Sequence, residues 1–190
     1  MDDYYSPHPT MILNRPVALG GFWGSQITET VVGIASVTGI PIIDVERRLE
    51  HHVGMRLQHY VDSFGLQELI ALEEQELPKM IPKTGMPPLI ALQPLTLMSK
   101  KNRSYLRKTT DMYYLEKSIF VLFANILEVL DRSDQTRFFH IPVQNPRDLS
   151  QISHLLKKYK LDCRKISNIV EANMHPLKVA QKLHLTLATA

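Results

Sequence analysis

Short apolar runs alternate along the chain with longer segments in which apolar residues recur every three or four positions. The short runs predict buried β-strands, at residues 15–22, 40–44, 87–92, 111–116 and 168–172. The longer segments predict helices, at residues 28–38, 45–54, 56–65, 66–81, 102–108, 118–130, 147–166 and 175–187. Pro78 and Pro82 are expected to end the fourth of these helices.

The alternation of strands and helices predicts the fold class. It favours an α/β fold of three layers, in which helices cover both faces of a central parallel sheet. Ligands of such folds bind at the carboxyl ends of the strands. We expect one domain over residues 1–190, with an N-terminal extension at 1–14, a polar lid-like loop at about 131–146 and a C-terminal helix and tail at 176–190.

Composition removes several classes of function. The 190 residues are 44% hydrophobic and 22% charged, as in an ordinary globular protein, and no apolar run is long enough to span a membrane. The net charge of +3 gives no reason to expect nucleic-acid binding. The acidic N-terminus has no apolar secretion signal, so we expect a cytoplasmic protein. Histidines 51, 52 and 59 lack metal-ligand spacing, and neither a metal site nor a cofactor is expected.

The segment after the first predicted strand has the spacing of a phosphate-binding loop. Such a loop reads G-x-x-x-x-G-K-[ST] and opens a helix. Here the matching positions are Gly21, Gly24, Ser25, Gln26, Ile27 and Thr28. Gln26 puts a side chain where the backbone must bend sharply, and strain of about 1–2 kcal/mol is expected there. Ile27 removes a charge-assisted contact to phosphate worth about 1.5–3 kcal/mol.

Several further motifs lie at matched distances from this loop. "GFWGSQIT" is followed by "IPIIDVERRLEHHVGM", then by Gly54-Met55-Arg56-Leu57 and a helix that leads to Gly65 and Glu73. In this order and spacing the chain resembles the shikimate kinase family, from Val17 to about Leu185. The resemblance implies a P-loop kinase fold related to nucleoside monophosphate kinases.

The resemblance also assigns expected roles, one position at a time. Ile27 occupies the position of the family's loop lysine, and Ile70 occupies the position of the arginine that binds the substrate carboxylate. Ile141-Pro142 stands at the lid arginine, and Lys158 is the loosely aligned counterpart of a second substrate arginine. The former substrate cleft would comprise Asp44, Glu46, Ile70, Glu73, Gln93, Pro94 and Leu95, the last three in place of a triple-glycine loop.

The pattern of replacement predicts a catalytically inactive pseudoenzyme, because phosphoryl transfer depends on positioning and charge neutralisation. The apolar side chains of Ile27, Ile70, Leu95 and Ile141 are expected to make the cleft stickier, that is, more hydrophobic and better suited to contact with a protein. We therefore predict a regulatory or adaptor protein that contacts a protein partner or a second copy of itself and binds no nucleotide. Two alternatives stay open: a small-molecule sensor that uses the cleft, and a divergent active kinase with Lys100, Lys101 or Arg103 as its cation.

The single tryptophan, Trp23, lies at the tip of the loop. It either packs into the vacated cleft or stands exposed as an anchor for a partner.

Overall fold

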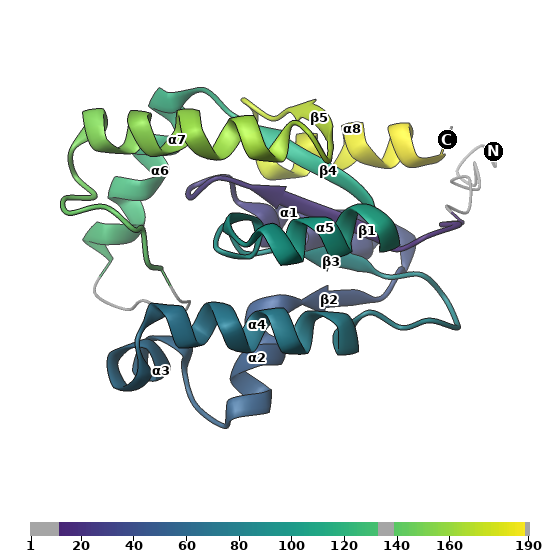
Figure 1. Cartoon of the computed structure of the whole chain (residues 1–190). Helices are drawn as coiled ribbons and strands as arrows, with labels where there is room; N and C mark the ends of the chain where they lie inside the picture. The colour runs from purple at the N-terminus through teal and green to yellow at the C-terminus, as the bar shows by residue number, and fades with distance from the viewer. Residues whose placement is uncertain (1–11, 133–138, 189–190) are drawn as a thin grey trace.

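A five-stranded parallel sheet forms the centre of the molecule (Figure 1). The computed structural model describes residues 12–132 and 139–188. The strands, in chain order, are β1 (Val17–Gly21), β2 (Ile42–Asp44), β3 (Leu89–Ala91), β4 (Asp111–Glu116) and β5 (Asn168–Glu171). Their spatial order is β2-β3-β1-β4-β5, so β1 is the central strand. All strands that the hydrophobic pattern predicted are present.

The helices follow the predicted segments closely. They are α1 (Ile27–Thr38), α2 (Val45–Val53), α3 (Leu57–Phe64), α4 (Leu66–Met80), α5 (Lys100–Thr109), α6 (Ile119–Asp131), α7 (Leu149–Cys163) and α8 (Pro176–Ala188), with a 3₁₀ turn η1 (Thr96–Met98). One boundary prediction is wrong, because Pro78 lies inside α4, which continues to Met80. A proline this close to a helix end breaks few backbone hydrogen bonds, so the last turn survives.

Helices cover both faces of the sheet, as the predicted three-layer architecture requires. On one face α1 packs against α8, and buried side chains such as Val31, Ile34 and Leu183 join those of β1. On the other face, the side chains of α4, α5, α6 and α7 bury a second apolar cluster that includes Leu77, Leu106 and Ile126. Figure 1 shows α8 behind the sheet and α4, α5 and α7 in front of it.

The sheet fixes where a site can form. Because β1 has β3 on one side and β4 on the other, the carboxyl ends of three neighbouring strands meet beside the segment that follows β1. No helix in the described ranges is both long and apolar enough to cross a membrane. Residues 1–11 of the expected extension, 133–138 of the expected lid and 189–190 of the tail lie outside the described residues.

Candidate functional site

The segment between β1 and α1 forms a tight loop, as the phosphate-binding motif predicted. Ser25 donates both its backbone N–H and its hydroxyl to the carbonyl oxygen of Phe22, which closes the turn. Gly24 has a φ of 82°, and a Cβ atom there would lie 2.6 Å from the carbonyl oxygen of Leu122 on α6. The loop therefore needs glycine at this position both for its backbone angle and for the close approach of α6.

Gln26 adopts the strained backbone that the sequence predicted. Its φ of 59° is the one positive φ of a non-glycine residue in the described ranges. Its side chain is held in place by two neighbours that are distant in sequence. Lys117 Nζ donates to Gln26 Oε1 at 2.8 Å, and Asn125 Nδ2 lies 3.5 Å from the same oxygen while donating to the Gly24 carbonyl at 2.7 Å.

Ile27 begins α1, and the end of its side chain packs against Gly21 at the start of the loop. Its side chain is buried in the apolar layer between α1 and α8. The position where a phosphate-binding loop carries its lysine is thus part of the hydrophobic core. Thr28 follows and lines the pocket described below.

Lys117 is the functional candidate that sequence reasoning missed. It follows directly after β4, precedes Ser118 at the start of α6, and is only 6% exposed. Burial lowers the pKa of Lys117, while the charge of Glu29 acts in the opposite direction. The only sequence signal was a charged residue at the junction of an apolar strand and its helix.

The cations proposed from sequence as stand-ins for the loop lysine lie elsewhere. Lys100 is exposed at the start of α5. Lys101 Nζ lies 3.6 Å from a carboxylate oxygen of Glu74, and Arg103 donates to the carbonyl of Leu97 at 2.7 Å. The latter two are engaged by α4 and η1, and a role for one of the three at the loop stays a prediction.

A pocket of about 280 Å³ opens between the loop, the segment after β3 and α6. It joins predicted loop residues to predicted cleft residues, and its lining includes Gly24, Gln26, Thr28, Glu46, Gln93, Pro94, Leu95, Asn125 and Arg132. Gln93 is 8% exposed, and its amide nitrogen has no hydrogen-bond partner among the described residues. The pocket is slightly smaller than the range of about 300–1,000 Å³ typical of small-molecule sites.

Comparison with known proteins identifies the fold and its relatives. No protein-family model matches the chain. The shikimate kinase of Thermodesulfovibrio yellowstonii is 24% identical over 170 residues, which cover 89% of this chain and 92% of the relative. The shikimate kinase structure from Acinetobacter baumannii in complex with shikimate has a TM-score of 0.76 at 19% identity, covering 93% of this chain and 95% of that chain. That from Bacteroides thetaiotaomicron has a TM-score of 0.73 at 16% identity, covering 91% and 98%.

The chain is a homologue of the shikimate kinases. It has their P-loop kinase fold, with the strained loop at the carboxyl end of the central strand. The resemblance found in the sequence is therefore confirmed at the level of homology and fold.

Two acidic residues expected in the cleft of this shikimate kinase homologue separate in the structure. Glu46 is buried and lines the pocket beside the loop. Asp44 instead caps α2, where its carboxylate accepts the backbone N–H of Arg47 at 3.3 Å, and it borders a different, shallow pocket with Arg48. Thr28 lines both pockets, and the expectation that the two acids face one cleft stays a prediction.

Glu73 is a buried carboxylate outside the pocket lining. It is 2% exposed and accepts a hydrogen bond from the Thr96 hydroxyl. Burial raises the pKa of Glu73 to about 7; the Thr96 bond lowers it and the charge of Glu74 raises it further. Ile70 lies one turn earlier on α4 and supplies no cation that could offset this burial.

Part of the expected lid belongs to the core. Ile141 is 7% exposed and packs with the apolar cluster of α4–α7, and Pro142 is half-buried. The pocket wall on this side comes from Phe139 and His140. Within the described ranges, no group of three or more histidine, cysteine or acidic residues has the geometry of a metal site.

Three of the four aliphatic replacements that were expected to make the cleft stickier are buried, although Leu95 also lines the pocket, and their effect on partner binding stays a prediction. Ile27, Leu95 and Ile141 are at most 8% exposed and serve the two apolar clusters. Ile70 is half-buried on α4. These side chains stabilise the fold by burying apolar surface and leave little of that surface for a partner.

Trp23 packs into the cleft, which resolves the two alternatives for this residue. It is 3% exposed, and its ring stands edge-on to Phe22 at a centroid distance of 5.1 Å. Tyr159 from α7 completes the cluster at 5.9 Å. The Tyr159 hydroxyl lies 3.0 Å from the carbonyl oxygens of both Gly21 and Pro94, and can donate to either.

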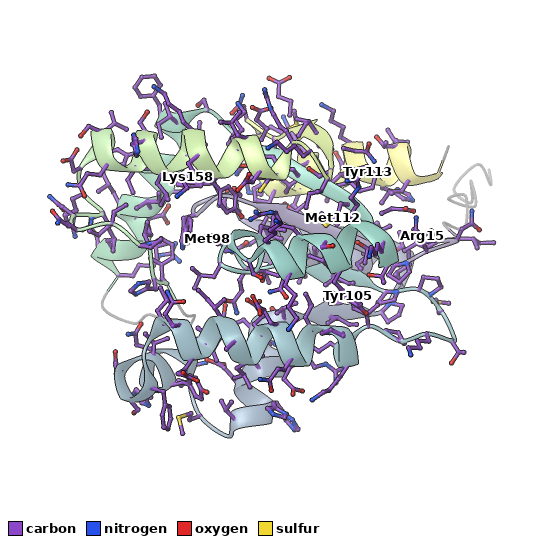
Figure 2. The ribbon with its side chains drawn as sticks, viewed as in Figure 1. Arg15, Met98, Tyr105, Met112, Tyr113 and Lys158 are labelled. Atoms are coloured by element: carbon purple, nitrogen blue, oxygen red, sulfur yellow. The ribbon has the colours of Figure 1, made fainter. Side chains whose placement is uncertain are left out.

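The side chain that α7 contributes to the site is therefore Tyr159. Lys158, which the loose alignment favoured, is an exposed residue of α7 (labelled in Figure 2). The helix rotates by about 100° per residue, so an alignment error of one position exchanges a buried side chain for an exposed one.

Proposed function

We propose that this shikimate kinase homologue is catalytically inactive and acts as a regulatory or adaptor protein through protein–protein contact. The observation that supports inactivity is the burial of Ile27 in the core at the position of the loop lysine. Phosphoryl transfer relies on cations that neutralise charge on the transferred group. A lysine at this position is the group that reaches the terminal phosphates of a bound nucleotide.

The substrate side of the cleft gives independent support. The resemblance places a carboxylate-gripping arginine at Ile70, where an aliphatic side chain cannot bind a carboxylate. Gln93, Pro94 and Leu95 put side chains where the resemblance implies three glycines that let the backbone approach the substrate.

In the proposed function, the inactive homologue acts by contact with a partner protein at its surface. Its contact surface would have to lie outside the buried aliphatic positions that the sequence analysis favoured. Self-association is the simplest form of such contact, and light scattering of the purified chain over a concentration series measures it directly.

A divergent active shikimate kinase is the second candidate, and Lys117 is the observation that favours it. Its ammonium group lies at the loop, although it comes from β4 rather than from α1. A small-molecule sensor is also supported, by the pocket of about 280 Å³ and by the unpartnered amide nitrogen of Gln93 within the described residues.

Transfer of phosphate from Mg-ATP to shikimate decides between the inactive and the active candidates. We expect no phosphorylated product from the wild-type chain. A variant with Gln26→Gly and Ile27→Lys restores the loop consensus, and it is expected to gain affinity for Mg-ATP. Turnover by the wild-type chain would favour the second candidate.

A further inference from the structure

Lys117 is a buried cation without a buried counter-charge. Its side chain is 6% exposed, and its ammonium has three N–H donors. Among the described residues, Gln26 Oε1 is the only acceptor within hydrogen-bonding distance, and no carboxylate lies within 4.0 Å. A charge removed from water in this way is costly unless another charge or several hydrogen bonds offset the cost.

A second positive feature faces the same place. Gln26 is the N-cap residue of α1, and its side chain does not cap the helix. The first N–H groups of a helix have no partner within the helix, and they carry the positive end of its dipole. Since Gln26 also accepts from Lys117, the ammonium and the first turn of α1 are held close together.

The loop side of this arrangement lines the pocket, and Lys117 lies behind Gln26. Gly24, Gln26 and Thr28 line the pocket on the loop side, and Asn125 lines it from α6. Asn125 also donates to the Gly24 carbonyl, so that this acceptor is already occupied. A negatively charged group that entered the pocket would therefore meet backbone N–H donors with a cation behind them.

We propose that Lys117 is the cation of this loop, moved from α1 to the carboxyl end of β4, and that the loop binds a phosphate group. Gln26 Oε1 stays an acceptor for one N–H of Lys117, and the other two N–H donors turn to the anion. The chemistry recognised is a phosphate group, whether of inorganic phosphate, pyrophosphate or a nucleotide.

This inference goes beyond the proposed function, because it concerns binding without transfer. The expectation that no nucleotide binds assumed a loop with no cation, and Lys117 removes that basis. The remaining replacements at Ile27 and Ile70 still leave the reacting groups without charge neutralisation.

Calorimetric titration of the full chain with phosphate, pyrophosphate and Mg-ADP tests the proposal. The fluorescence of Trp23, the one tryptophan and a pocket residue, gives a second readout. Lys117→Met removes the charge at similar volume and is expected to weaken binding about tenfold or more. Lys157→Met is the matched control, because that lysine is exposed on α7, and its affinities should equal those of the wild type.

Each outcome decides a specific point. Absence of binding by all three probes overturns the proposal, and so does unchanged affinity in Lys117→Met. Tighter binding of Mg-ADP than of phosphate identifies a nucleotide site, and the reverse identifies a site for the inorganic ion. If Lys117→Met does not fold, Lys117→Gln keeps a donor to Gln26 without the charge and must show the same loss. Transfer to shikimate would contradict the proposed function but not this inference, so the two can fail separately.

Discussion

The hydroxyl of Tyr159 lies 3.0 Å from the carbonyl oxygen of Gly21 and equally close to that of Pro94. One side chain of α7 thereby joins the loop after β1 to the segment after β3. The ring of Tyr159 also packs against Phe22 and Trp23, at centroid distances of 5.5 Å and 5.9 Å. Tyr159 thus satisfies buried backbone acceptors at the centre of the candidate site.

Tyr159→Phe is expected to destabilise the protein by about 1–3 kcal/mol, because a buried carbonyl loses its donor. Urea unfolding measures the change. Tyr105→Phe is the matched control, since the Tyr105 hydroxyl lies 3.4 Å from its acceptor, the Pro78 carbonyl, and the side chain is only half-buried. A loss of stability in Tyr159→Phe no larger than in the control would show that the Tyr159 hydroxyl does not stabilise the fold.

The buried carboxylate of Glu73 should make the free energy of unfolding depend on pH. Its pKa is about 7 in the folded chain and 4.5 in the unfolded reference, so the folded state binds more protons between these values. Stability should therefore fall as the pH rises from about 4.5 to about 7 and stay level above, by about 3 kcal/mol in total for this group.

Glu73→Gln should remove this slope and raise stability at pH 8 relative to the wild type. Thermal unfolding at pH 5, 6, 7 and 8 measures the profile, with Glu68→Gln, an exposed residue of the same helix, as the control. An identical slope in wild type and Glu73→Gln would contradict the burial cost assigned to this carboxylate.

Two small substitutions at Gln26 should differ in their effect on stability. Alanine and glycine both remove the acceptor for Lys117, but only glycine adopts a φ of 59° without steric cost. Gln26→Gly should therefore be more stable than Gln26→Ala by about 1 kcal/mol. Chemical denaturation of both variants gives the difference directly. Equal stabilities would mean that the loop relaxes around alanine and stores no strain.

Local features of the site could be predicted from the sequence. The strain at Gln26 follows from a single φ that the loop motif imposes. The order of strands and helices also followed, because alternation of the two hydrophobic periods extends over the whole chain.

Contacts between distant segments could not be predicted in the same way. Lys117 is 91 positions from Gln26, and Tyr159 is 138 positions from Gly21. Nothing local marks either residue as a partner of the loop, since the contact depends on strand register and on the rotation of α7. The same limitation explains why Lys158 was favoured over its neighbour.

The central claim is that this homologue does not transfer phosphate to shikimate. The most direct measurement is product formation by the purified wild-type chain from Mg-ATP and shikimate, with Lys117→Met assayed in parallel. Because the proposed protein is inactive, we expect no product above the protein-free blank for either chain. Turnover by the wild type that disappears in Lys117→Met would contradict this expectation and would show that the relocated lysine serves an active kinase.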